Sequence, residues 1–110
     1  MPDKFFILEN KLEMIKIPLS HIYYFEKIKN TDHVCVAYSG GLASFKSDLN
    51  SLLGKLDDRF LQCHKSYIAN ISSIVRIEKF QTYLTLHFST QVHCPCSFMY
   101  KSEVLQKWKS

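Results

Sequence analysis

The chain is poor in the residues that most often interrupt or specialise a backbone, with three glycines and three prolines in 110 residues. So few glycines argue against a loop that cradles phosphates, because such loops need several glycines in one segment. Long apolar runs are also missing, and none approaches the roughly 20 residues that cross a bilayer. Residues 1–4 lack the charged and apolar regions of a secretory signal peptide. We therefore expect a cytoplasmic protein with no membrane partner.

Arginine is scarce as well, since Arg59 and Arg76 are the only two among the 14 residues counted as Lys or Arg. With 10 acidic residues, the net charge is +4, a mildly basic balance that suits a polyanionic partner but indicates one only weakly. A hydrophobic content of 46% is typical of a folded globule and not of a disordered segment. The length predicts one domain, covering residues 1–110.

Catalytic signatures are missing from the sequence too. It contains no motif typical of serine hydrolases, zinc proteases or phosphate-binding loops, and no paired-carboxylate pattern. Cys63 and His64 are a nucleophile and a base in adjacent positions. In an extended segment, however, adjacent side chains point to opposite faces and cannot act together. We therefore expect no enzymatic activity.

The cysteines are expected to be reduced thiols, because no secretory signal precedes them; they are Cys35, Cys63, Cys94 and Cys96. His93, Cys94 and Cys96 supply soft metal ligands, but the C-x-C spacing is not that of structural zinc sites. In a strand, Cys94 and Cys96 would share one face as small core residues. We expect no metal and no cofactor, while a redox pairing of Cys63 with Cys94 or Cys96 remains a hypothesis.

Short alternating or apolar runs dominate the chain, which predicts antiparallel strands separated by turns. The expected strands cover residues 5–8, 13–17, 21–26, 33–38, 42–45, 74–80, 83–88 and 92–96. Four leucines at helical spacing predict a short helix over residues 47–56, capped by Ser47. A second helix is expected at the C-terminus, capped by Ser102, with Val104, Leu105 and Trp108 on one side. The predicted fold class is mostly β, with antiparallel sheets and one or two short helices.

Polar and basic side chains concentrate in three segments between the regular elements. The segments hold Lys29 and His33, then Lys65 and Ser66, and finally Met99, Tyr100 and Lys101. Lysine, histidine, serine and tyrosine in loops can contact phosphates, and lysine can also hydrogen-bond base edges. Each segment alone is more typical of an ordinary solvated surface.

Three stretches together carry a family resemblance. Residues 17–26 form a strand start, residues 49–56 a short leucine-rich helix, and residues 60–70 read Phe-Leu-Gln-Cys-His-Lys-Ser-Tyr-Ile-Ala-Asn, followed by Ile74 and Ile77. In these features the chain resembles the LytTR domain family from about Met14 to Lys107. Members usually form the DNA-binding half of bacterial response regulators.

The resemblance implies an elongated fold of antiparallel sheets whose loops reach into successive major grooves of the duplex. It carries DNA contacts onto His33 in the first segment and Lys65 in the second. His64 is expected to be buried and structural, and Asn70 to hold a turn.

The third segment departs from the family pattern. After the serine that matches Ser97, members commonly carry one or two arginines, whereas this chain has Phe98 and Met99. Neither side chain can read guanine bidentately as arginine does. Three alternatives stay open: backbone contacts by Tyr100 and Lys101, apolar contacts to thymine methyls, or little contribution from this loop.

The resemblance therefore predicts sequence-specific binding of double-stranded DNA at promoters by a response-regulator output domain. No receiver domain is found in the chain, so it is expected to be an excised or stand-alone domain. It is expected to be monomeric alone and dimeric on tandem half-sites. The alternative is a β-rich protein-interaction module that has lost DNA binding and uses aromatic residues such as Tyr23, Tyr24 and Phe25.

Overall fold

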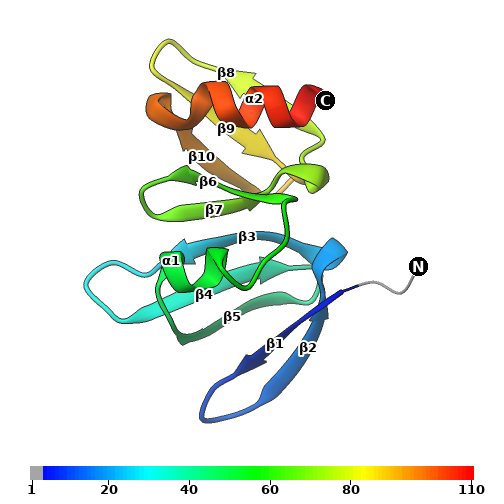
Figure 1. Ribbon diagram of the computed structural model, residues 1–110, viewed down its shortest axis with the longest axis vertical. Helices are drawn as coiled ribbons and strands as arrows, with labels where there is room; N and C mark the ends of the chain where they lie inside the picture. The colour runs from blue at the N-terminus through cyan, green and yellow to red at the C-terminus, as the bar shows by residue number, and fades with distance from the viewer. Residues whose placement is uncertain (1–3) are drawn as a thin grey trace.

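The computed structural model describes residues 4–110, and its strands form three antiparallel sheets (Figure 1). The expectations for residues 1–3 lie outside the described residues. The two-stranded sheet holds β1 (Phe5–Glu9) and β2 (Met14–Pro18). The five-stranded sheet has the order β5 (Gly41–Lys46), β4 (His33–Tyr38), β3 (Ile22–Lys27), β7 (Tyr67–Asn70), β6 (Phe60–His64). The three-stranded sheet has the order β10 (His93–Ser97), β9 (Tyr83–His87), β8 (Arg76–Lys79).

Two α-helices and three 3₁₀ turns complete the described part of the chain. The helices are α1 (Leu49–Leu53) and α2 (Lys101–Lys109), and the turns are η1 (Leu19–His21), η2 (Ile71–Ser73) and η3 (Phe98–Tyr100). The predicted fold class, mostly β with antiparallel sheets and one or two short helices, is confirmed. No helix within residues 4–110 is long and apolar enough to cross a membrane.

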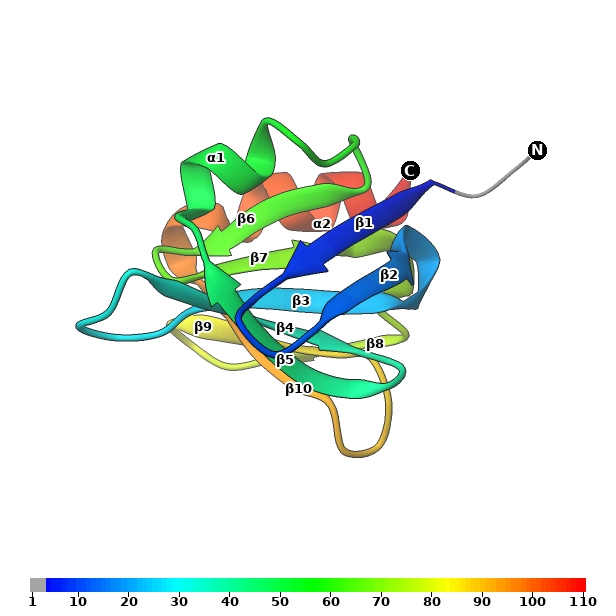
Figure 2. The same ribbon diagram turned by 90° about the horizontal axis from the view of Figure 1, so that it is seen from below.

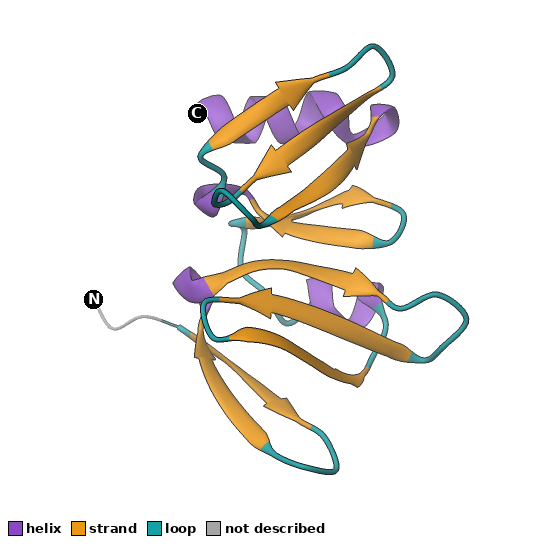
Figure 3. Cartoon of the chain, turned by 180° about the vertical axis from the view of Figure 1, so that it is seen from behind, coloured by secondary structure: helices purple, strands orange, loops and turns teal. Residues whose placement is uncertain are grey.

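The five-stranded sheet lies between two hydrophobic cores. Figures 1 and 3 show it between the two-stranded sheet on one side and the three-stranded sheet on the other. Because side chains alternate along a strand, Phe25 and Ile68 face the first core while Tyr24 and Ala69 face the second. Helix α1 closes the first core, and α2 covers the second through the fully buried Val104.

Phe25 sits at the centre of the first core. Its ring lies 5.4 Å from that of Phe6, 6.3 Å from Phe45 and 6.0 Å from Phe60, measured between centroids. These rings come from four strands, so one aromatic cluster fixes the β1–β2 hairpin to the five-stranded sheet.

The first helix is shorter than predicted and has a different cap. Helix α1 spans five residues, and Asp48, not Ser47, is the N-cap: its Oδ1 accepts a hydrogen bond of 2.9 Å from the Ser51 N–H. The helix ends at Leu53 with Gly54 as its C-cap, and so the leucine spacing that extends to Leu56 continues past the helix into a turn.

The second helix begins one residue before the predicted cap. Helix α2 starts at Lys101, and its N-cap, Tyr100, makes no side-chain capping bond. Its apolar side is as predicted: Val104 is buried, Leu105 packs against the second core, and Trp108 donates its indole N–H to the Ile74 carbonyl at 2.9 Å.

Strands β6 and β7 were not predicted. The register between them shifts at Cys63, where a β-bulge places an extra residue between Gln62 and His64. A bulge breaks the two-residue alternation that reveals a strand in the sequence. The two strands are joined by the two-residue turn Lys65–Ser66.

Asn70, at the end of β7, connects the segment around η1 to the segment around η2 through hydrogen bonds. It is the buried polar residue of the described core, with 0% exposure. Its side-chain amide donates to the carbonyls of Leu19 (3.3 Å) and Ile22 (2.9 Å), and its oxygen accepts from the Ser72 N–H (3.1 Å). The expectation that Asn70 holds a turn is therefore confirmed at η2.

Candidate nucleic-acid interface

The three segments singled out in the sequence lie along one edge of the molecule. In Figure 1 the β3–β4 loop, the β6–β7 turn and the η3 end of α2 all lie at the left, and Figure 2 shows the same grouping from below. Each segment is anchored to strands of a packed sheet. We call this set, residues 28–33, 65–66 and 98–101, the loop edge.

Internal hydrogen bonds fix the β3–β4 loop. Asn30 adopts a positive φ of 62°, a conformation that asparagine tolerates well. The Thr31 hydroxyl donates to the Ile28 carbonyl at 2.8 Å and accepts from the His33 N–H at 3.1 Å. Lys27 donates its ammonium to the Thr31 carbonyl. Lys29, at the tip of this ordered loop, is exposed.

His33 belongs to a charged cluster at the start of β4. Its Nδ1 lies 2.9 Å from Asp32 Oδ1, while Lys46 Nζ lies 3.5 Å from Asp32 Oδ2. Desolvation acts to raise the pKa of the Asp32 carboxyl, but backbone and His33 hydrogen bonds and the Lys46 charge outweigh it and lower the pKa. With Nδ1 held by the carboxylate, Nε2 is the nitrogen left to meet a ligand.

Asp32 and Lys46 were missed in the sequence. The hairpin centred on the Ser39–Gly41 turn pairs His33 with Lys46, and this register is a signal that the sequence already contained. A carboxylate among the basic groups of the loop edge lowers the local positive charge, which matters for an anionic ligand.

The β6–β7 turn presents Lys65 to solvent. The Ser66 N–H donates to His64 Nδ1 at 3.1 Å, and the Ser66 carbonyl accepts from the Lys27 N–H at 2.8 Å. Gln62 donates its side-chain amide to the His64 carbonyl at 3.1 Å. The turn is thus fixed to both neighbouring strands, and Lys65 is exposed at its tip.

His64 is structural but not fully buried. Its Nδ1 accepts a hydrogen bond from the turn, and its ring meets Tyr67 edge-on at 5.4 Å between centroids. The side chain is half-buried, which corrects the expectation of complete burial. Burial and a hydrogen bond to the Glu26 carboxylate raise the pKa of the Tyr67 hydroxyl.

The third segment presents apolar side chains at the loop edge. Phe98 is 66% exposed and Met99 88% exposed on the 3₁₀ turn η3. The Lys101 ammonium lies 5.8 Å from the centroid of the Phe98 ring. Tyr100 packs against the second core, so it is less available to a ligand than its neighbours.

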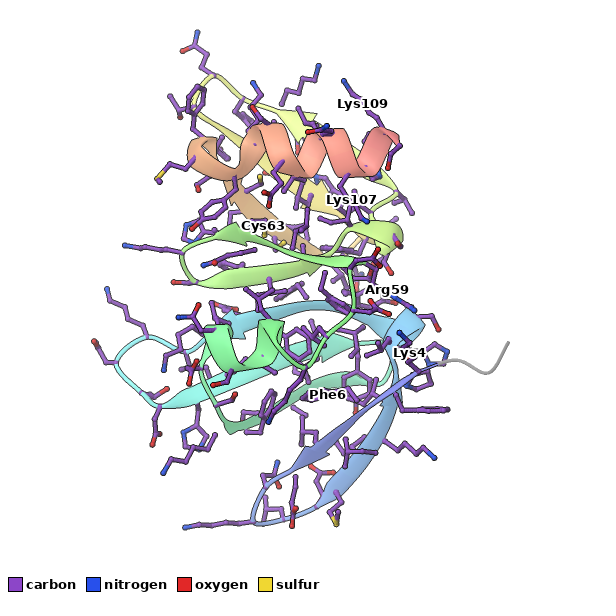
Figure 4. The ribbon with its side chains drawn as sticks, viewed as in Figure 1. Lys4, Phe6, Arg59, Cys63, Lys107 and Lys109 are labelled. Carbon is purple, nitrogen blue, oxygen red and sulfur yellow. The ribbon has the colours of Figure 1, made fainter. Side chains whose placement is uncertain are left out.

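Three of the cysteines meet in the second core, where Cys63 lies between β6 and the three-stranded sheet (Figure 4). The sulfurs of Cys63 and Cys94 are 3.9 Å apart, and Cys63 donates to the Pro95 carbonyl at 3.4 Å. Hydrogen bonding to Cys94 and burial raise the pKa of the Cys63 thiol, and burial raises that of Cys96 to about 12.

Cys94 and Cys96 occupy the core face of β10, as the strand alternation predicted, and His93 is exposed. Within residues 4–110, no three histidine, cysteine or acidic side chains gather in a way that could hold a metal ion.

The aromatic run offered as a protein-binding surface is one buried residue, Phe25, and two half-buried ones, Tyr23 and Tyr24. Phe25 has 0% exposure in the first core. Tyr23 and Tyr24 pack on the opposite side of the sheet, with ring centroids 5.8 and 6.0 Å from Phe88. All three residues therefore pack in the two cores or against them, and the loop edge is the site that we consider further.

Three antiparallel sheets, with three connecting segments gathered along one edge, define a small, mostly β domain. The chain belongs to the LytTr DNA-binding domain family, whose model matches residues 12–109. This is a family of DNA-binding domains and not an enzyme family.

A solved structure with the same fold is described as the LytTr DNA-binding domain of a response regulator from Bacillus cereus. It is 22% identical, has a TM-score of 0.81, and the match covers 99% of both chains. None of the curated proteins compared with the chain matches it.

Proposed function

We propose that the chain binds double-stranded DNA at promoters in a sequence-specific manner, as the output domain of a transcriptional response regulator. The observation that carries this proposal is the gathering of three anchored segments at the loop edge, in a chain of a DNA-binding family. Rigid loops on a packed scaffold hold their side chains in a fixed pattern, which suits a repeated target such as a duplex.

Each basic residue of the loop edge has a proposed role. Lys29 and Lys101, with Ser66, contact phosphates and set the register of the protein on the duplex. Lys65 and His33 read base edges: the ammonium donates to guanine acceptors, and His33 Nε2 pairs with a donor or acceptor according to its protonation. Met99 and Tyr100 complete the third segment.

The proposed assembly is the one that membership of a family of DNA-binding domains suggests. The single domain, residues 1–110, acts in the cytoplasm as a monomer when free and as a dimer on tandem half-sites. Neither a metal nor a cofactor takes part in the proposed binding, and no catalytic step is proposed.

Selection of bound duplexes from a random DNA pool tests the proposal. The wild type is expected to enrich a defined motif, and Lys65→Ala to lose information at one position, with a cost of about 1–3 kcal/mol on the selected site. Lys109→Ala is the matched control, because Lys109 lies at the end of α2 opposite η3 (Figure 4).

Two outcomes would contradict parts of the proposal. Wild-type protein that enriches no motif even at low salt would refute sequence-specific binding and favour the protein-interaction module. Lys65→Ala that binds every sequence as the wild type does would remove Lys65 from base reading while leaving DNA binding in place.

A further inference from the structure

The third segment presents two consecutive large apolar side chains where the other two segments present cations. Phe98 and Met99 are 66% and 88% exposed, although the segment is an ordered 3₁₀ turn joined directly to α2. Tyr100, the next residue, does pack against the second core. The turn therefore directs one side chain inward and holds two outward. It belongs to the loop edge, whose three segments Figures 1 and 2 show grouped on one side of the molecule.

Among the groups that base pairs expose in the major groove, one gains from apolar contact: the C5-methyl of thymine. Guanine, cytosine and adenine offer hydrogen-bonding groups that Phe98 and Met99 cannot match. Burying a thymine methyl against a flexible thioether or a ring removes apolar surface from water on both sides.

The position of Lys101 affects which parts of the Phe98 ring can meet a ligand. Its ammonium lies over the Phe98 ring at 5.8 Å from the centroid. A ring with a cation over one face still presents its edge and its other face to a ligand. The same ammonium lies beside the apolar pair and is suited to a neighbouring phosphate.

We propose that Phe98 and Met99 are specificity-determining residues that select thymine through its C5-methyl group. This inference rests on the proposed DNA-binding function and specifies what its third segment reads. The target is expected to have one or two thymines beneath η3, at positions where an arginine would select guanine.

Uracil substitution isolates the methyl group, because deoxyuridine differs from thymidine at C5 alone. In the motif selected by the wild type, each thymine is replaced in turn by deoxyuridine, and dissociation constants are measured by fluorescence anisotropy. At one or two positions uracil is expected to weaken wild-type binding about fourfold, the factor for about 0.8 kcal/mol per buried methylene-sized group.

Phe98→Ala and Met99→Ala are expected to lose this thymine preference at the corresponding position, so that both duplexes bind equally. Val75→Ala is the matched control: Val75 is 69% exposed but follows η2, at the end of β7 away from the β6–β7 turn. It is expected to keep the full preference. Circular dichroism melting of each variant checks that the fold is intact.

The outcomes separate this inference from the function on which it rests. If the wild type selects no motif, the proposed DNA-binding function fails. If it selects a motif but is indifferent to uracil at every position, or if both variants keep the wild-type ratio, thymine reading is overturned and sequence-specific binding stands. A uniform loss of affinity in both variants, with the ratio unchanged, overturns thymine reading as well and assigns the pair to the backbone.

Discussion

At the scale of single residues, one buried amide connects segments far apart in the chain. The Asn70 side chain satisfies two carbonyls near η1 and one N–H of η2, with partners up to 51 positions away. Buried polar groups that lose a partner cost more free energy than the bond itself contributes, since they have left water. We therefore expect this residue to contribute to the stability of the fold.

Replacing Asn70 by alanine is expected to lower the free energy of unfolding by about 3 kcal/mol, because it leaves buried carbonyls unsatisfied. Urea unfolding followed by tryptophan fluorescence measures the change. Asn50→Ala, at an exposed position of α1, should stay within about 0.5 kcal/mol of the wild type. Equal effects of the two substitutions would show that the Asn70 hydrogen bonds do not stabilise the fold.

The charge of the Asp32 carboxylate is expected to affect DNA affinity. Asparagine at this position can still accept from His33 Nδ1 but carries no charge, and it releases Lys46 from its ion pair. We expect Asp32→Asn to strengthen binding to specific and random duplexes alike, by about twofold to fivefold at low salt.

Asp58→Asn is the matched control. It removes the same charge from a side chain that is 94% exposed and precedes β6, whereas the β6–β7 turn of the loop edge follows β6. It should leave duplex affinity unchanged. An Asp32→Asn protein that binds no more tightly than this control would place the β3–β4 loop outside the DNA contact.

At the scale of elements, the packing of β6 against β10 determines the chemistry of the cysteines. A disulfide needs sulfurs about 2.05 Å apart, so Cys63 and Cys94 must approach from 3.9 Å inside a packed core. The raised pKa values of Cys63 and Cys96 also keep these groups as thiols, and the thiolate is the reactive form.

We expect all four thiols to remain free after brief treatment of the native protein with mild peroxide. Labelling with a thiol reagent should reach Cys63, Cys94 and Cys96 only after denaturation, while Cys35, which is half-buried, reacts first. Mass spectrometry of the labelled protein counts the thiols. An intramolecular disulfide between Cys63 and Cys94 in the native protein would contradict this expectation and support redox pairing.

The sequence predicted most of the elements but not all of them. The β4–β5 hairpin was predictable because apolar alternation and the Ser39–Gly41 turn agree, and Cys94 and Cys96 follow the same rule. Strand β6 escaped because the bulge at Cys63 disrupts the alternation. Strand β7 escaped because Ile68 and Ala69 are buried on opposite faces of the sheet, so apolar and polar residues do not alternate. The α1 cap was misplaced because Ser47 and Asp48 are both good capping residues, and only backbone geometry selects one.

The candidate site, too, was only partly predictable from the sequence. Residue types identified three polar segments, but their meeting at one edge depends on how the sheets stack, which periodicity does not encode. The ion pairs of Asp32 needed the hairpin register. The exposure of Met99 beside a packed Tyr100 depends on how η3 enters α2.

At the scale of the whole molecule, the proposed interface predicts how DNA affinity depends on salt, because each cation that contacts a phosphate releases counterions. Three lysines belong to this edge: Lys29, Lys65 and Lys101. Lys29 and Lys101 are the two proposed to contact phosphates. Each phosphate contact contributes about −0.9 to the slope of log K against log salt, so these two predict a slope of about −2 on a single half-site.

Affinity measured over a range of potassium chloride concentrations tests this expectation. Lys29→Ala and Lys101→Ala should each reduce the steepness of the slope by about 1, because both are proposed to contact phosphates. Lys109→Ala should not change it. A wild-type slope near zero would rule out an electrostatic DNA interface on this edge.

The pairing of β3 with β7 also bears on how fast the molecule forms. Tyr24 lies opposite Ala69, so the central pair of the main sheet joins residues 45 positions apart, with β4, β5, α1 and β6 between them in the chain. Closing so long a loop costs chain entropy before the strand pairing can stabilise the chain. Proteins dominated by such distant pairings refold in milliseconds to seconds, not microseconds. We therefore expect slow refolding in stopped-flow experiments, with both hydrophobic cores incomplete until this one ladder has closed.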